Sequence, residues 1–295
     1  ALTTTTPGAM PRTTVHKADG TQVGELPSVA EEPPFKPKAE FGKAVGQARQ
    51  YEVVVIRPRD FDPKKKYPVI VDVYGGPHHQ HVVAAMRNWL LPQWLADQGF
   101  IVVAIENRGT PGRRGNWEGA IYQKFGSVPI EDQVEALRAL GASFEEMDLK
   151  RVGITGWSFG GYMSALAVLK RPDVYKAAVA GAPVTDWEDY DTHYTERYLG
   201  LLPEGKKAYE EASLLPLASK LERPLLLVHG TADDNVYFRH TLRLSNALFR
   251  AGKDFELLPL PGLTHMVPDP VVTQRLHSRI ARFFQTHLGK PKERG

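Results

Sequence analysis

The most constraining feature of this sequence is a glycine-flanked serine, Gly156-Trp157-Ser158-Phe159-Gly160, at the junction of two apolar segments. Arg151–Thr155 before it has the pattern of a short buried strand, and Tyr162–Leu169 after it predicts a helix that ends before Pro172. A chain that passes directly from a strand into a helix must turn sharply, so small residues are needed on both sides of the serine. The sequence therefore predicts a strand–turn–helix unit whose serine hydroxyl projects above a sheet.

Strand and helix patterns alternate from residue 51 onward. Further strands are predicted at Tyr51–Arg57, Pro68–Tyr74, Phe100–Glu106, Ala177–Ala182, Pro224–His229 and Phe255–Leu260. Further helices are predicted at Ala85–Gln98 with a break near Pro92, at Ile130–Leu140, at Phe238–Ala251 and at Val271–His287. Repeated alternation of this kind indicates an α/β fold with a mostly parallel sheet and helices on both faces.

Residues 1–50 differ from the rest, because threonines and prolines interrupt every helical period. Thr14–Lys17 followed by Asp19-Gly20 predicts a β-hairpin with an Asp-Gly turn. The chain begins with Ala1 and has no signal-peptide pattern, so we expect it to be part of a longer protein. We therefore divide it into residues 1–50, a linker or the end of a preceding β domain, and an α/β domain over residues 51–295.

Composition excludes several classes of function. The chain has no cysteine, which excludes disulfides, thiolate metal sites and a cysteine nucleophile. A net charge of +3 is too small to indicate nucleic-acid binding, and the basic tail Lys290–Arg294 is expected to be solvated. No apolar run reaches the length of a membrane-spanning helix. Soluble, periplasmic, secreted and cytoplasmic locations all stay open.

An acidic partner for the serine is expected in a loop after a later strand. A serine hydroxyl becomes a good nucleophile only when a histidine accepts its proton, and a carboxylate orients that histidine. In α/β-hydrolases the three residues follow in the order Ser, acid, His. The segment His229–Val236 directly follows an apolar strand, and we choose Asp233 as the acid paired with Ser158. Asp234 is the alternative, otherwise a loop-stabilising carboxylate.

The histidine expected to act as base is His265, which follows a later strand and precedes the last helix. Its rival is His229, at a strand end close to the acid, but His229 precedes Asp233 in the chain and therefore has the wrong order. The histidines in helical or linking segments, His193, His240, His277 and His287, are expected to be structural or exposed.

The segment Tyr74–His81 offers two further readings. The run His78-His79-Gln80-His81 lacks an Asp, Glu or Cys at ligand spacing, so no metal site is predicted there and no cofactor is expected. Tyr74 precedes Gly75-Gly76-Pro77 at a strand end. Its hydroxyl could donate to an oxyanion beside the N–H of Phe159, or the ring could be a buried strand aromatic, which the residues alone favour.

Several motifs together resemble the prolyl oligopeptidase family of serine peptidases, and within it the dipeptidyl peptidase IV branch. The resemblance extends over roughly residues 51–288. Its motifs, in chain order, are Val73-Tyr74-Gly75-Gly76-Pro77, Gly156-Trp157-Ser158-Phe159-Gly160-Gly161-Tyr162, Ala182-Pro183-Val184-Thr185-Asp186-Trp187, Tyr194-Thr195-Glu196-Arg197-Tyr198-Leu199-Gly200 and His229-Gly230-Thr231-Ala232-Asp233-Asp234-Asn235-Val236.

The resemblance implies an α/β-hydrolase fold and a set of site residues. Ser158, Asp233 and His265 would form the catalytic triad, with Tyr74 and the N–H of Phe159 in the oxyanion hole. A proline pocket would consist of Phe159, Val184, Trp187, Tyr190, Tyr194 and Val236, with Asn235 holding a substrate carbonyl. An aromatic box suits the compact apolar proline ring, although Trp187, Tyr190 and Tyr194 taken alone could be a helix packing stripe. Small differences in fit cost little, so alanine at the same substrate position is also expected to be accepted.

The chain departs from the family pattern in two respects. Phe159 stands where dipeptidyl peptidases usually carry tyrosine, which should alter only local hydrogen bonding. The β-propeller that precedes the hydrolase domain in this family, and binds the substrate amine there, cannot be formed by residues 1–50. Strict dipeptide release therefore cannot be inferred from these residues alone.

The resulting hypothesis is a serine peptidase domain that cleaves after proline or alanine through an acyl-enzyme and releases dipeptides in the full-length enzyme. Its expected partners are peptides with proline near the N-terminus and the propeller of the same protein, and a homodimer is left open. The alternatives are an acyl-peptide hydrolase or esterase of the same fold, and an inactive hydrolase-like binding domain.

Overall fold

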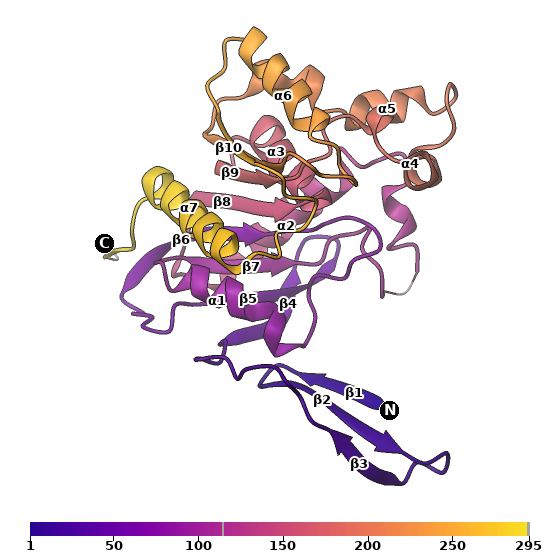
Figure 1. The fold of residues 1–295 in the computed structure, drawn as a ribbon. Helices are drawn as coiled ribbons and strands as arrows, with labels where there is room; N and C mark the ends of the chain where they lie inside the picture. The colour runs from indigo at the N-terminus through magenta and orange to yellow at the C-terminus, as the bar shows by residue number, and fades with distance from the viewer. Residues whose placement is uncertain (114, 294–295) are drawn as a thin grey trace.

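A central, mostly parallel sheet organises the chain in a computed structural model that describes residues 1–113 and 115–293 (Figure 1). Its strands are β4 (Ala39–Val45), β5 (Gln50–Ile56), β6 (Lys65–Asp72), β7 (Ile101–Ile105), β8 (Met147–Trp157), β9 (Tyr175–Gly181), β10 (Leu225–Gly230) and β11 (Glu256–Leu260). They lie in the order β11-β10-β9-β8-β6-β7-β5-β4, and a short β12 (Lys292–Glu293) pairs with β6. Strands β6 to β11 run parallel, whereas β5 and β4 pair antiparallel at one edge. Arg294, in the tail expected to be solvated, lies outside the described residues.

Helices cover both faces of this sheet. They are α1 (Leu90–Ala96), α2 (Val128–Ser143), α3 (Phe159–Lys170), α4 (Thr192–Leu199), α5 (Lys206–Ala212), α6 (Arg239–Arg250) and α7 (Pro270–Leu288), with 3-10 turns η1 (Met86–Trp89), η2 (Gly119–Ile121), η3 (Trp187–Asp189) and η4 (Leu215–Lys220). Because side chains alternate along a strand, Val69 and Val71 of β6 join the core under α2 and α3. Ile70 joins the second core under α1 and α7. The predicted α/β-hydrolase architecture is confirmed.

The strand pattern of the sequence is reproduced closely, and one helix differs in detail. The break expected near Pro92 is the change from η1 to α1 at Leu90, so Pro92 lies inside the first turn of α1. Proline is tolerated there because the first N–H groups of a helix have no partner within it. Helices α4 and α5 were not among the expected elements.

Arg151 ties the end of the last helix to the sheet. Its guanidinium donates to the carbonyls of Leu288 and Lys290 at 3.2 and 2.7 Å, and to the carbonyl of Lys66 in β6 at 3.3 Å. Because α7 ends at Leu288, these bonds fix its C-terminal end against the strands.

The first 50 residues form two different structures. Strands β1 (Leu2–Thr6), β2 (Ala9–His16) and β3 (Gln22–Leu26) make a separate antiparallel sheet that extends away from the central one (Figure 1). The hairpin expected around Asp19-Gly20 is the β2–β3 turn. Strand β4, in contrast, pairs with β5 along its whole length, so residues 39–45 belong to the central sheet. The assignment of residues 1–38 to a preceding domain stays a prediction.

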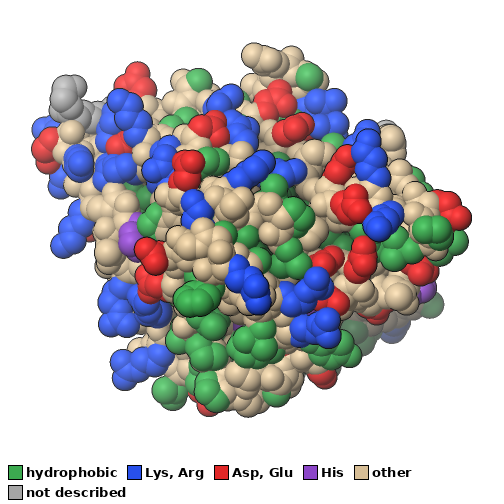
Figure 2. Space-filling model, turned by 90° about the horizontal axis from the view of Figure 1, so that it is seen from above, with side chains coloured by type: hydrophobic (Ala, Val, Ile, Leu, Met, Phe, Trp, Pro, Cys, Tyr) green, Lys and Arg blue, Asp and Glu red, His purple; other side chains and the backbone are tan. Residues whose placement is uncertain are grey.

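The surface has no region dominated by one sign of charge on the face that Figure 2 shows. Lysine and arginine side chains alternate there with aspartate and glutamate, with hydrophobic side chains between them. This distribution agrees with the small net charge of +3. No helix among residues 1–113 and 115–293 has both the length and the apolar character needed to cross a bilayer.

The role of β4 predicts different outcomes for two truncations. A chain that starts at residue 35 should unfold at the same denaturant concentration as the full chain, because it keeps the Lys38 N–H that donates to the buried Gln93 at 2.8 Å. A chain that starts at residue 50 should lose at least about 2 kcal/mol, since it loses β4 and the Phe41 ring that packs edge-on against Trp89 at 5.9 Å. Urea unfolding followed by circular dichroism measures both. Equal stability of the two truncated chains would show that β4 is not part of the folding unit.

Candidate active site

Ser158 lies at the sharp turn between β8 and α3. Its backbone adopts φ 60° and ψ −118°, a left-handed conformation that is rare for a residue with a side chain. The turn is held by two backbone hydrogen bonds of 2.9 Å, from Ser158 N–H to the Gly181 carbonyl and from Tyr162 N–H to the Ser158 carbonyl. A Cβ at Gly156 or Gly160 would lie 2.2 or 2.1 Å from the Val73 carbonyl oxygen. Because of these close backbone contacts, neither position can carry a side chain, as the sequence motif predicts.

The structure brings Asp233 and His265 together. His265 Nδ1 lies 2.8 Å from Asp233 Oδ2. The other oxygen, Asp233 Oδ1, accepts the N–H groups of Asn235 and Val236 at 3.0 and 2.9 Å. The Asp233 side chain is fully buried, so these charge-assisted bonds fix both the carboxylate and the imidazole ring.

His265 is also fixed through its backbone. The indole Nε1 of Trp157, the residue before Ser158, donates to the His265 carbonyl at 2.7 Å. The described residues contain no hydrogen bond between the Ser158 hydroxyl and the His265 ring. Such bonds commonly tighten only when substrate is present.

His229 occupies a different position from the one a base requires. Its Nδ1 lies 2.7 Å from the Thr241 hydroxyl, and its Nε2 lies 2.7 Å from the Val236 carbonyl and 3.2 Å from Asp233 Oδ2. Burial lowers its pKa, which favours the neutral ring. Both ring nitrogens are thus engaged, and His229 supports Asp233 from behind. Asp234 is exposed, and no hydrogen bond joins it to either histidine among the described residues.

Tyr74 and Phe159 lie on either side of the serine turn. Phe159 is the first residue of α3, so its N–H has no acceptor within the helix. The Tyr74 ring lies 6.1 Å from the Phe159 ring and 4.7 Å from His79. Burial, aided by the nearby Tyr190 and Tyr198, raises the pKa of Tyr74 to about 12. The Tyr74 hydroxyl therefore keeps its proton at neutral pH and can donate it.

An aromatic box lies beside these groups. Trp187 and Tyr194 stack with ring centroids 6.1 Å apart and planes 12° apart, and Tyr190 meets them edge-on at 5.8 and 5.4 Å. Val184 and Val236 are fully buried next to it. The Tyr190 hydroxyl donates to Asn235 Oδ1 at 2.8 Å. Within the described residues no acceptor is bonded to the Asn235 amide nitrogen, which leaves it able to donate.

Sequence reasoning missed the floor of this box. Phe125 is completely buried, and its ring lies 5.1 Å from Phe159 and 4.8 Å from Trp187. Phe125 comes from an irregular segment before α2, where no periodicity marks a core position. His78 also contributes: its Nε2 lies 2.6 Å from the Tyr198 hydroxyl. No cluster of three or more His, Asp or Glu side chains able to hold a metal occurs among residues 1–113 and 115–293.

His240 supports the segment that carries the box. Its Nδ1 accepts the N–H of Thr185 at 3.2 Å, while the Thr185 hydroxyl donates to the His240 carbonyl at 2.8 Å. Burial lowers the pKa of His240 to about 4, partly opposed by the carboxylates of Asp189 and Asp186. The ring is therefore neutral at pH 7, as an acceptor must be.

Comparison with known proteins identifies the family and the fold of the chain. The sequence model of the prolyl oligopeptidase family matches residues 87–291. Mouse (Mus musculus) dipeptidyl peptidase 8 is 40% identical over 241 residues, which are 80% of this chain and 27% of that protein. Pig (Sus scrofa) dipeptidyl peptidase 4 is 34% identical over 240 residues, 80% of this chain and 31% of that protein. The crystal structure of Porphyromonas gingivalis dipeptidyl peptidase 4 aligns with a TM-score of 0.88 and 30% identity, covering 97% of this chain and 41% of that one.

Fold and similarity together define the class: a serine peptidase domain of the α/β-hydrolase fold. More particularly, the chain belongs to the prolyl oligopeptidase family, in the dipeptidyl peptidase IV branch. It spans about a quarter to a third of the length of the curated relatives that it matches.

Because His240 is neutral in the folded chain and ionises near pH 6.5 when unfolded, its contribution to stability is present above pH 6.5 and is lost as the pH falls toward 4. His240→Asn keeps an acceptor for the Thr185 N–H but cannot titrate. Between pH 7.5 and pH 5, the free energy of unfolding of the native chain should fall by about 2 kcal/mol more than that of His240→Asn. Urea unfolding at both pH values measures this. Equal losses would contradict the buried neutral assignment.

Proposed function

We propose that this chain is the catalytic domain of an exopeptidase that cleaves after proline, or alanine, through an acyl-enzyme. The observation that carries the proposal is the 2.8 Å contact between the buried Asp233 carboxylate and His265, whose backbone is tied to the residue before Ser158. An imidazole held in this way presents its other nitrogen as a base, which is what a serine nucleophile requires.

In the proposed mechanism, Ser158 Oγ attacks the carbonyl carbon of the scissile peptide while His265 Nε2 takes its proton. Asp233 stabilises the imidazolium that forms. The Tyr74 hydroxyl and the Phe159 N–H donate to the oxyanion, where preorganised donors act more strongly than in water. His265 then gives the proton to the leaving amine, and the acyl group stays on Ser158 until water, activated by the same histidine, releases it.

The aromatic box is the proposed site for the residue before the scissile bond. Trp187, Tyr190 and Tyr194 form an apolar aromatic wall, and a proline ring, which has no N–H to satisfy, is proposed to pack against it. The free amide N–H₂ of Asn235 is the proposed donor to a substrate carbonyl. A smaller alanine side chain would bind there more weakly, since it buries less apolar area.

Release of dipeptides is proposed for the full-length protein. The names of the relatives, dipeptidyl peptidase 8 and dipeptidyl peptidase 4, support this activity. The groups that would bind the substrate amine are proposed to come from a preceding β-propeller, to which residues 1–38 would belong. In that case the chain described here supplies the chemistry and the proline pocket, and the preceding domain limits the length of the substrate.

Ser158→Ala should abolish covalent labelling by a fluorophosphonate and lower kcat/KM for glycyl-prolyl-p-nitroanilide at least about 10⁴-fold, because the nucleophile is absent. Ser143→Ala is the matched control, since that hydroxyl is exposed and, within the described part of the chain, bonds only to the Ala139 carbonyl. Normal labelling of Ser158→Ala would refute the mechanism. Faster turnover of p-nitrophenyl butyrate than of the prolyl substrate would favour an esterase, and no adduct on the native chain would favour a binding domain.

Tyr74→Phe tests the oxyanion role. The variant should lower kcat about 10²- to 10³-fold with little change in KM, because the lost hydrogen bond exists only in the transition state. Pre-steady-state release of p-nitroaniline measures the acylation step directly. Tyr122→Phe, at an exposed tyrosine, should leave both constants unchanged. If Tyr74→Phe raised KM and left kcat unchanged, Tyr74 would instead be a substrate-binding residue.

A further inference from the structure

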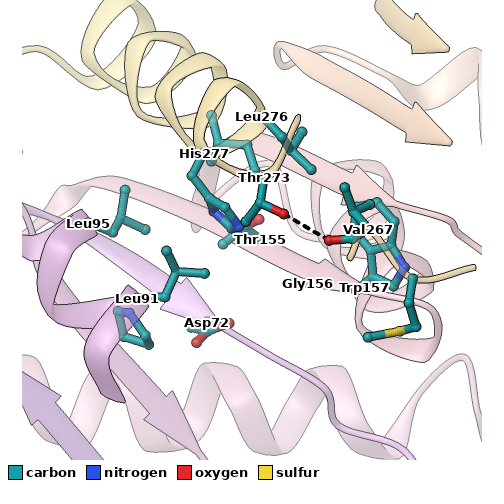
Figure 3. Close-up of a pocket in the computed structure, with 13 residues that line it drawn as sticks. Asp72, Leu91, Leu95, Thr155, Gly156, Trp157, Val267, Thr273, Leu276 and His277 are labelled. Atoms are coloured by element: carbon teal, nitrogen blue, oxygen red, sulfur yellow. Dashed lines mark hydrogen bonds between the residues drawn. The ribbon is translucent and has the colours of Figure 1, made fainter. Parts of the chain in front are cut away.

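A cavity of about 290 Å³ lies between α1 and α7, over the ends of β6 and β8 (Figure 3). Its walls are largely apolar and include Leu91, Leu95, Leu276 and Ile280 from the two helices. The cavity opens to the surface, where its rim includes the exposed residues Leu91 and Met266, and it exceeds the 150 Å³ that can bind benzene. The space is therefore large enough for one aromatic ring with a short side chain.

Three polar side chains reach this space from three different elements. Asp72 ends β6, Thr155 lies in β8 and His277 lies in α7, and Figure 3 shows them between the two helices. Among the described residues, no hydrogen bond is formed by the side chain of Thr155 or of His277. Burial lowers the pKa of His277, which favours its neutral form. A ligand with one polar end would find unused partners here.

Asp72 belongs to a group of two carboxylates and one histidine. Asp72 Oδ2 forms an ion pair with His81 Nε2 at 3.4 Å, and the buried carboxylate of Glu106 accepts the N–H groups of His81 and Val82 at 2.9 and 2.8 Å. One histidine thus faces two carboxylates, and the neighbouring His79 has a pKa lowered by burial. A positively charged group in the cavity, next to Asp72, would balance the second carboxylate of this group.

The same cavity touches the backbone next to two proposed catalytic residues. Trp157 directly precedes Ser158, and Met266 and Val267 directly follow His265; all three border the space. The Thr273 hydroxyl, from the first turns of α7, donates to the Val267 carbonyl at 2.8 Å, as the dashed line in Figure 3 marks. Anything bound in the cavity contacts the segment that positions His265.

We propose that this cavity is a second ligand site, separate from the proline pocket, for a small apolar molecule with a primary ammonium group, such as an arylalkylamine. The ring lies among the leucine and isoleucine side chains, and the ammonium group donates to Asp72 and Thr155. Occupancy fixes the segment that follows His265 and changes turnover. The proposal goes beyond the peptidase reaction, and its binding can be measured without that reaction.

Calorimetric titration tests the site in the full chain after phenylmethylsulfonyl fluoride has blocked Ser158. 2-Phenylethylamine should bind with one equivalent, and the uncharged analogue 2-phenylethanol at least tenfold more weakly, since the ammonium–carboxylate bond is charge-assisted. Asp72→Asn should remove this difference, whereas Asp60→Asn, at an exposed carboxylate elsewhere, should preserve it. Absence of saturable amine binding, or equal binding of amine and alcohol, overturns the proposal.

Two variants that fill the space locate the binding. Ile280→Trp places an indole inside the cavity, and Leu91→Trp does so from its rim, where the native side chain is 42% exposed and a larger one is readily folded. Both should weaken 2-phenylethylamine at least tenfold, whereas Leu242→Trp on the exposed side of α6 should not. Undiminished binding to Leu91→Trp would place the amine elsewhere and overturn the site.

Coupling to the catalytic centre is measured with unmodified protein. Saturating 2-phenylethylamine should change kcat for glycyl-prolyl-p-nitroanilide at least twofold, at the concentration at which it binds, and Leu91→Trp should abolish this change. Binding without any change in kcat would overturn the coupling. A chain with no turnover at all would refute the proposed function, while titration of Ser158→Ala, which needs no reaction with the inhibitor, would still decide whether the cavity binds an amine.

Discussion

The arrangement of the site depends on one close backbone contact, that of the glycines around Ser158 with the carbonyl of Val73. A single added methyl group at Gly156 or Gly160 would come within 2.2 Å of that oxygen. The contact brings the start of α3 against the segment that follows β6, where Tyr74 lies. The strained backbone of Ser158 is maintained by this packing and by the bonds to Gly181 and Tyr162. The proposed nucleophile and the proposed oxyanion donors therefore depend on the same backbone contact.

Buried hydrogen-bond partners stabilise the charged group of the site, the Asp233 carboxylate. Asp233 accepts hydrogen bonds from two backbone N–H groups and lies next to His229. These groups stabilise its negative charge independently of His265. His229 and His240 are both buried, and burial lowers the pKa of each, so both favour their neutral forms. The neutral His240 accepts the N–H of Thr185. The neutral His229 pairs with the Thr241 hydroxyl and the Val236 carbonyl. Among the described residues His265 is bonded only through Nδ1 of its ring, which leaves its Nε2 for the proposed reaction.

The sequence was sufficient for the elements with strong local signals. Apolar runs of β6 to β10 predicted the parallel sheet, and chain order together with loop position singled out Asp233 and His265, which the structure brings together. Phe125 could not be found, because its place under Trp187 is set by tertiary packing of an irregular segment. Strand β4 was assigned to the preceding segment, since its weak alternation becomes meaningful only once it pairs with β5. The catalytic roles of these residues stay predictions.

The bonds of Arg151 anchor one end of α7. Its C-terminal end is pinned to β6, while its N-terminal end continues into the segment that carries His265. Between these two ends, Leu276, Ile280, Phe283 and Phe284 are buried against the sheet. The segment that carries His265 therefore continues into a helix that is fixed to the strands at several points, which limits how far the imidazole can shift relative to Asp233.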